Sequence, residues 1–484
     1  MNGYKRQHPA KIFYLVSRRF WLMLIPLARG LVALRWDFYS WVRGAWFDIL
    51  IVLFIGISAY LRWHCTYYKL ENERISIQTG IFAKRNFSVP YEKSSVFLAE
   101  HKFFLRPFGA ANLYLDTNAG GVRKTDVSLT VSEKDCEQLF AVLKKDSGIK
   151  ASYQPGMKRL VVFSIMFSST LSGVIYIGTL LSQSGKLLGR SLQTMLFTAV
   201  TDVSKSLALK IPPLALGISL FIFAGWLFSF LSSLLRHIRF AVSRNGERLE
   251  ISGGFFTKRN YIINSYGINY ADLKQNLLSK LFSVMSINIG CSGYGKGKNE
   301  IPMLIPITTK SQALSSLKML LPKSVPGGYG IKPRWDYILR FITMPAIFCI
   351  LIPLASKKLF MLFPLWRNMI VFVCIMGEIP ALWMLFIKLC AWVSTGIFFD
   401  EKNIILRYSY WYSFHTVIIP KEKIAKVSVS QNIFQIMSGA CDVRIYPAGE
   451  SPKPHLVIAL NINALSDLLK ASGLSCEKIN NFRT

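Results

Sequence analysis

Apolar runs of membrane-spanning length alternate with segments of mixed polarity along this chain. Four runs are close to the roughly 20 residues that cross a hydrocarbon core of about 30 Å. They predict transmembrane helices at about 46–63, 160–181, 211–235 and 369–393. Two weaker runs, at about 20–34 and 338–354, are shorter or are interrupted by Pro345 and Pro353. Counting both, we expect three pairs of spans.

The segments between the apolar pairs carry a repeat with the pattern of β-strands. "GIFAKRN" at Gly80 returns as "GFFTKRN" at Gly254, and a third copy is aligned when Tyr410 is taken as the equivalent position. Residues 74–78 and 248–252 alternate polar and apolar side chains, as half-buried strands do. A glycine directly after each strand indicates a turn with positive φ or a close backbone approach. Because the alignment needs no insertion, we predict three copies of one folded module.

Each predicted module ends in a helix. Ser132 with Asp135 three residues later resembles a capping box, and the counterparts of this helix run at 310–321 and 463–471. Several strands closed by one helix make a small α+β module. An apolar pair followed by one module therefore forms a unit.

Three such units fill the chain, and each follows a short basic segment that contains glycine or proline. We expect units at 1–150, 151–328 and 329–484, with modules at about 64–147, 237–322 and 395–472. Since each unit contributes an even number of spans, all three modules lie on one side of the membrane. Similar units can pack as a pseudo-symmetric ring, because helices need partners and strand edges need cover.

Composition supports a membrane protein and not a nucleic-acid-binding one. The residues are 52% hydrophobic and 17% charged, and the formal net charge is +32. Membrane proteins concentrate Lys and Arg on the cytoplasmic side, and no module with an aromatic and basic nucleic-acid-binding face is recognisable. We expect the modules in the cytoplasm and no nucleic-acid partner, although Lys357, Lys358 and Arg367 lie on the opposite side.

Motifs for metal or enzyme chemistry do not stand out. The eight cysteines form no C-x-x-C pair, and the six histidines show no metal-ligand spacing. "GYGKGKNE" at 293–300 lacks the order of a P-loop and is expected to be a polar loop. We therefore expect no catalytic residues, no cofactor and no metal.

The repeat resembles the bacterial pleckstrin-homology-like, membrane-flanked domain family, type 2. The resemblance rests on a strand, then G-x-F/Y-x-K/R-R, an I/V-P, a Q/H-N/K-x-x-x-R-x-F-G stretch and a further strand. The first copy carries Lys84-Arg85, Val89-Pro90, His101 and the run from Arg106 to Gly109. The second copy keeps Lys258-Arg259 and Gln275-Asn276, but has Asn264 for the proline and Phe282-Ser283 for Phe-Gly. The third keeps Ile419-Pro420, Gln431-Asn432 and Gly439 but has Phe414-His415 for the basic pair.

The resemblance covers most of the chain and implies a fold and a class of protein. The fold is a PH-like β-sandwich or barrel of two bent sheets with a C-terminal helix, in a bacterial cell-membrane protein. The resemblance also implies that multi-copy chains can work beside a smaller relative with a single unit, and it brings no catalytic residues. These implications agree with the β-then-helix pattern of each module.

The basic pairs are candidates for contact with the membrane surface. Lys84, Arg85, Lys258 and Arg259 occupy the same turn in two modules, where they could meet anionic headgroups. The alternative is that they are solvated hairpin charges that discourage edge pairing.

Two further features have open alternatives. The apolar stretch "KFFLRPFG" at 102–109 either packs in the core, docks a neighbour or enters the membrane interface. Glu378 lies within a predicted span and is an intramembrane polar candidate, with Lys388 or Arg29 as possible partners.

These features together predict a non-enzymatic membrane scaffold or binding platform. Its PH-like modules are expected to bind protein partners or anionic lipid at the cytoplasmic surface. The alternative is a transporter or channel component, including an envelope-protection factor against membrane-active peptides. Transporters often have inverted repeats and several polar residues at mid-membrane depth. Here the repeats are parallel and only Glu378 is a clear candidate of that kind, which favours the platform.

Overall fold

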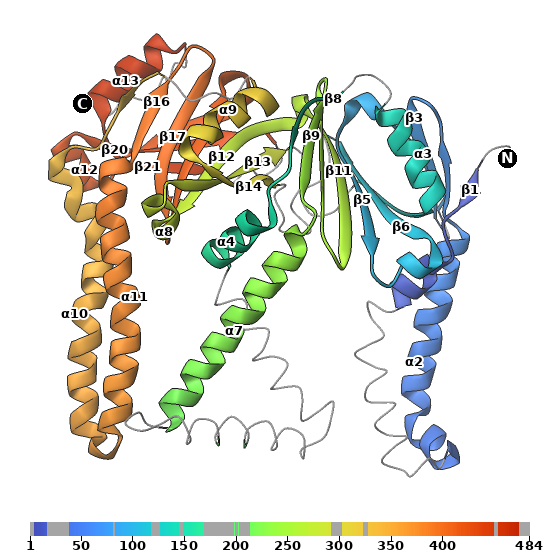
Figure 1. Cartoon of the computed structure of the whole chain (residues 1–484), viewed down its shortest axis with the longest axis horizontal. Helices are drawn as coiled ribbons and strands as arrows, with labels where there is room; N and C mark the ends of the chain where they lie inside the picture. The colour runs from blue at the N-terminus through green and yellow to red at the C-terminus, as the bar shows by residue number, and fades with distance from the viewer. Residues whose placement is uncertain are drawn as a thin grey trace.

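The computed structural model describes residues 4–16, 38–80, 83–117, 126–144, 149–168, 198, 202, 213–291, 303–322, 328–449 and 454–473. Within these ranges the chain forms three β-rich modules in a row, and long apolar helices extend from one side of the row (Figure 1). The first and third modules lie at opposite ends of this row (Figure 1), so the expected ring is wrong for this chain. The modules do touch their neighbours, as the ring hypothesis required.

Each module contains strands followed by a C-terminal helix. The first has β2 (Tyr67–Leu70), β3 (Arg74–Thr79), β4 (Arg85–Pro90), β5 (Ser94–Lys102), β6 (Ala110–Thr117), β7 (Val127–Ser132) and α3 (Glu133–Lys144). The second has β9 (Ala241–Asn245), β10 (Arg248–Gly253), β11 (Thr257–Asn264), β12 (Ile268–Asn276), α8 (Leu277–Leu281), β13 (Val284–Cys291), β14 (Met303–Thr309) and α9 (Lys310–Leu320). The third has β16 (Gly396–Phe399), β17 (Asn403–Tyr410), β18 (Ser413–Pro420), β19 (Ile424–Ser430), α12 (Ile433–Ser438), β20 (Ala440–Pro447), β21 (His455–Asn461) and α13 (Ile462–Ala471).

The predicted helix cap is present in the first module. The backbone N–H of Asp135 donates to Ser132 Oγ at 3.2 Å, which satisfies one of the free N–H groups at the start of α3. The helices of the second and third modules begin within one residue of their expected starts at 310 and 463. The module pattern read from the sequence is thus confirmed.

The segment before each apolar pair adds a strand that the sequence pattern did not indicate. These strands are β1 (Lys5–Arg6), β8 (Ile149–Tyr153) and β15 (Tyr329–Ile331), which pair with β2, β9 and β16. Each basic linker is therefore held on its own module. The chain enters the apolar pair from beside the module to which it later returns.

The sheets continue from one module into the next. The strand orders are β1-β2-β3-β4, then β7-β6-β5-β11-β10-β9-β8, then β14-β13-β12-β18-β17-β16-β15, and finally β19-β20-β21. Each seven-stranded sheet joins the second half of one module to the first half of the next, through the pairs β5–β11 and β12–β18. One hydrophobic core contains Val96 of the first module, most of the buried apolar residues of the second module and Ile418 of the third. The three modules are consequently packed against one another through shared sheets and a shared hydrophobic core.

Several apolar helices leave the module layer on one side (Figure 1). They include α2 (Phe38–His64), α7 (Pro213–His237), α10 (Ile338–Leu362) and α11 (Arg367–Ser394). Among the described residues, three helices are long and apolar enough to cross a membrane, at Ser219–His237, Trp335–Leu362 and Pro364–Ser394, and Leu50–His64 is a shorter apolar helix. The expected span at about 20–34 lies outside the described residues, and so does most of the one at 160–181, where α4 covers Met157–Phe167.

The third unit contains the expected helical hairpin. Helices α10 and α11 lie side by side and are joined by the short turn η5 (Pro364–Trp366) (Figure 1). Helix α10 continues past the expected end at 354 to Leu362, through both Pro345 and Pro353. Proline is tolerated in apolar membrane helices when nearby groups compensate the lost backbone bond.

Candidate functional site

The hairpin between β10 and β11 meets the end of α7 at the base of the module layer. The N–H of Gly254 donates to the carbonyl of Ile238 at 2.9 Å, and the N–H of Phe255 donates to the carbonyl of Leu235 at 3.0 Å. Gly254 has a φ of 106°, and a Cβ there would lie 2.1 Å from the carbonyl oxygen of Thr257. The repeated glycine therefore serves both predicted purposes, a positive φ and a close backbone approach. It fixes the hairpin tip against the end of an apolar helix.

A basic pocket of about 200 Å³ opens beside this tip. Its cations come from three segments, with Arg106 in η2 (Arg106–Phe108) of the first module, Arg239 just after α7, and Lys258 in β11. No carboxylate is among its described lining residues. Converging cations without an acid favour an anionic ligand, because each like charge raises the electrostatic cost of an empty site.

The pocket is held by contacts between the first two modules. Arg106 Nη2 donates to the carbonyl of Phe255 at 2.8 Å, so the guanidinium reaches across the module boundary. Arg239 has a left-handed backbone conformation, with φ of 57°, as residues just after a helix often do. Lys258 is exposed. The pocket is thus a product of two modules and the end of a helix, and neither module alone could form it.

Exposed aromatic rings lie near the pocket, and one of them, Phe255, lines it. Phe103 and Phe104 of the first module are 57% and 68% exposed, and Phe255 and Phe256 of the hairpin tip are about half exposed. The rings of Phe103 and Phe256 pack edge to face with centroids 6.3 Å apart. The alternative of core packing is confirmed for Leu105 in the stretch "KFFLRPFG", but it is wrong for the phenylalanines around it, which are exposed.

A groove of about 360 Å³ runs between the hairpin tip and α7. Phe228, Leu231 and Leu235 of the helix line it together with Phe255 and Phe256, while Arg236 and Arg259 lie in the same lining. An apolar groove next to a basic pocket has the chemical layout of a lipid, with hydrocarbon on one side and a charged group on the other.

Arg259 belongs to the junction between the first two modules. Its Nε lies 3.2 Å from Oε1 of Glu100, whose side chain is 4% exposed, and the two residues are direct partners in the β5–β11 register. A second ion pair joins the same modules, between Lys144 and Glu250 at 2.6 Å. The charge of Arg259 thus compensates a buried carboxylate.

The four predicted surface cations do not gather at one place. Lys258 lines the basic pocket and Arg259 lies in the module junction, although the two are adjacent in β11. Lys84 and Arg85 lie at the equivalent hairpin of the first module, at the end of the row, and both are exposed. Arg106 and Arg239 are not among the site residues predicted from the sequence. The run of basic residues at the end of α7, which includes Arg236 and Arg239, was the available signal.

The counterparts of the phenylalanine stretch in the other modules are also apolar and exposed. They include Leu281 and Phe282 near α8, and Ile433, Phe434 and Met437 in α12, with exposures of 63% to 84%. Each of these two loops is tied to an apolar segment: Asn276 donates to the carbonyl of Met166 in α4, and Tyr337 before α10 donates to the carbonyl of Ser438 at 2.5 Å. All three modules therefore present apolar loops next to the ends of apolar helices.

The repeated Gln-Asn of the motif has a structural use. Gln275 and Gln431 donate to backbone carbonyls of the following strand segments, while Asn276 and Asn432 cap the helices α8 and α12. Gly109 and Gly439 take the left-handed conformation after the loop, and Ser283 takes it in the second module. The Gln-Asn pair and the left-handed residue after it therefore shape the loop.

Glu378 lies in α11, as predicted, and its carboxyl oxygen Oε2 is buried without a hydrogen-bond partner among the described residues. Lys388, one of its possible partners, donates instead to Ser409 Oγ at 3.1 Å, at the module end of the helix. Arg29 and "GYGKGKNE" lie outside the described residues. Within the described ranges, no group of three or more His, Cys, Asp or Glu side chains could hold a metal.

The three repeats match a known family of domains. The profile of the family described as "Bacterial PH domain" matches residues 21–147, 196–315 and 341–472. The transmembrane protein YdbT of Bacillus subtilis (strain 168) is 22% identical over 301 residues, which cover 56% of this chain. The aligned part spans 60% of the length of that relative.

Proposed function

Because this chain belongs to the bacterial PH domain family and carries its domain three times along a transmembrane protein, we propose that it is a non-enzymatic platform at the membrane surface. In this proposal the three modules bind anionic lipid beneath the row and hold protein partners beside it. The smaller single-unit relative that multi-copy chains can accompany is one such partner. The row lies on the cytoplasmic face of the bacterial cell membrane, as the basic residues near the modules favour.

The observation that carries the proposal is the basic pocket together with the exposed phenylalanines near it. Phe255 is hydrogen-bonded to the end of α7, so the pocket lies where that helix leaves the module layer. Aromatic rings are favoured at the headgroup level of a bilayer, and each Lys or Arg near an anionic surface contributes about 1 kcal/mol. The pocket thus combines the two kinds of side chain that favour this depth.

Neutralising the pocket is expected to remove its preference for anionic lipid. In an Arg239→Gln/Lys258→Gln double variant, the loss of two charges should weaken retention of phosphatidylglycerol by roughly 2 kcal/mol, which is more than tenfold. Native mass spectrometry of the full chain, released from micelles with equal phosphatidylglycerol and phosphatidylcholine, counts the retained lipids. Arg106 is left in place because it holds the hairpin.

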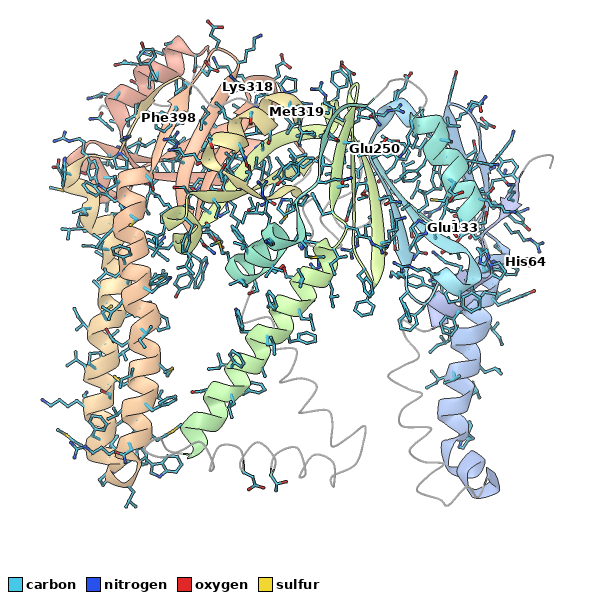
Figure 2. The ribbon with its side chains drawn as sticks, in the orientation of Figure 1. His64, Glu133, Glu250, Lys318, Met319 and Phe398 are labelled. Carbon is cyan, nitrogen blue, oxygen red and sulfur yellow. The ribbon has the colours of Figure 1, made fainter. Side chains whose placement is uncertain are left out.

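A matched control changes two exposed lysines on the other side of the module layer. Lys318 lies there, away from the apolar helices (Figure 2), and Lys470 is in α13 at the top of the row (Figure 1). Lys318→Gln/Lys470→Gln removes the same charge and should leave phosphatidylglycerol retention unchanged. Equal retention by the pocket variant and the control would contradict lipid binding at the pocket.

A further inference from the structure

The two junctions between modules are built on one rule. When Gly80, Gly254 and Tyr410 are taken as equivalent, the fifth residue after the origin of one module lies opposite the twentieth residue of the preceding module in both cases. These pairs are Arg259 with Glu100, and His415 with Lys274. Strands β11 and β18 are thus equivalent acceptors, and β5 and β12 are equivalent donors, of the same antiparallel pairing.

Both junctions also bring a basic side chain to an acid of the preceding module. Arg259 lies 3.2 Å from Glu100, and His415 Nδ1 lies 2.9 Å from Asp272. The basic residue occupies the same position in both acceptor strands. The acid is at the twentieth position in β5 and at the eighteenth in β12.

The chain repeats this acceptor strand once more without a described partner. Strand β4 is the equivalent of β11 and β18 and lies at the edge of its four-stranded sheet. Five of its six residues are exposed, whereas β11 and β18 are mostly buried or half-buried. Arg85 stands at the position of Arg259 and His415, and it makes no ion pair with any described residue.

A second copy of this chain does not supply the matching strand. Its donor strands β5 and β12 are already paired, and the remaining equivalent, β19, is the edge of a three-stranded sheet. Strand β19 has Ser428 and Ser430 at both positions where the inner donors carry an acid. Pairing β19 with β4 would leave Arg85 without a carboxylate and would bring together two chains of net charge +32.

We propose that β4 is a docking edge for a PH-like module of a different chain, which adds a β5-type strand antiparallel to β4 and places a carboxylate opposite Arg85. The added strand continues the first sheet by backbone hydrogen bonds, as strand addition does elsewhere, and the Arg85 pair fixes its register. This inference rests on the platform role proposed above, but it uses no residue of the basic pocket. Failure of lipid binding there leaves it untouched.

A peptide with the sequence of the first junction tests the edge directly. Residues 92–102, "EKSSVFLAEHK", include β5 with Glu100, and residues 422–432, "EKIAKVSVSQN", are the equivalent stretch with β19 and its serines. Fluorescence anisotropy of each labelled peptide is measured with the full chain in nanodiscs, and binding to empty nanodiscs is subtracted. We expect the 92–102 peptide to bind at least roughly tenfold more tightly than the 422–432 peptide, because only it carries a glutamate at the position that pairs with Arg85.

A charge exchange separates docking from nonspecific adsorption. Arg85→Glu in the chain should weaken the 92–102 peptide roughly tenfold or more, and a Glu100→Arg version of the peptide should restore its binding to that variant. Hydrogen exchange of the β4 amides should slow when the peptide is bound. Equal binding of both peptides would overturn the proposal in favour of a second copy, and absence of binding by either, with unchanged β4 exchange, would overturn it altogether.

Discussion

Replacing Arg259 with glutamate is expected to open the junction between the first two modules. The change leaves Glu100, which is 3% exposed, facing another carboxylate in the register of β5 and β11. Breaking a buried pair costs about 3–5 kcal/mol. Lys102, whose Nζ lies 3.6 Å from Oε2 of Glu100, compensates only part of this loss. Hydrogen-exchange mass spectrometry of the full chain should show faster exchange in β5 and β11 together, while β20 and β21 of the third module keep their protection.

The neighbouring residue and the reciprocal change supply the controls. Lys258→Glu alters an exposed side chain one position away and should leave the exchange of β5 almost unchanged, because exposed charges contribute little to stability. A Glu100→Arg/Arg259→Glu exchange keeps one charge of each sign and should recover much of the lost protection. If Arg259→Glu exchanges like the wild type, the junction does not depend on this pair.

Acidification is expected to weaken the third module through His455. This residue is 7% exposed, and burial lowers its pKa from 6.5 to about 4. The Tyr408 hydroxyl and Nδ1 of His455 share a hydrogen bond at 2.8 Å, and Tyr270 packs edge to face on the ring. Of the charged neighbours, Asp272 raises the pKa and His415 lowers it, and burial outweighs both.

The direction of the effect follows from which state, folded or unfolded, binds the proton of His455 more readily. The unfolded chain takes up this proton below pH 6.5, whereas the folded module resists it until about pH 4. The stability contributed by neutral His455 is therefore complete above pH 6.5 and is lost as the pH falls toward 4. The loss approaches about 3 kcal/mol, at about 1.4 kcal/mol for each pKa unit.

A His455→Gln variant isolates this proton. Glutamine can still share a hydrogen bond with Tyr408 and cannot titrate, so the variant should lose less stability than the wild type between pH 7 and pH 4. Hydrogen exchange of β21 peptides, corrected for the intrinsic effect of pH, gives the free energy of opening for both chains. Identical pH slopes would show that His455 is charged in the folded module or that other groups dominate.

The module and its repeat could be predicted because they depend on local signals. Alternation at 74–78, the helix start at Ser132 and the glycine at Gly254 each reflect the conformation of a few neighbouring residues. Even the reason for the glycine was predictable, since a side chain there would meet the carbonyl of Thr257. The apolar runs likewise predicted α7, α10 and α11.

The junctions could not be read in the same way, because they join residues far apart along the chain. Arg259 and Lys258 are adjacent in sequence and identical in type of charge, yet one compensates a buried glutamate and the other lines the pocket. Successive side chains along β11 point to opposite faces of the sheet, and the first module covers one of these faces. The short strands β1, β8 and β15 escaped prediction because a two- to five-residue strand forms only when a partner edge is available.

The candidate pocket combines predictable and unpredictable parts. Lys258 was selected from the repeat, but its companions Arg106 and Arg239 come from a different module and from the end of a helix. The sequence left three alternatives open for the stretch that contains Phe103 and Phe104, because an apolar loop has the same composition whether it packs inward, docks a neighbour or faces a membrane. In the structure, Leu105 takes the inward position and the phenylalanines remain outside.

Lipid contact at the module tips is the claim on which the account depends most, and photo-cross-linking measures it without altering the chain. The full protein is reconstituted with phosphatidylglycerol that carries a diazirine near its headgroup, and labelled peptides are identified by mass spectrometry. The account predicts labels within 103–108 and 254–258, beside the basic pocket, and none on α9 or α13. Labels confined to the apolar helices, with the phenylalanine tips unmarked, would contradict it.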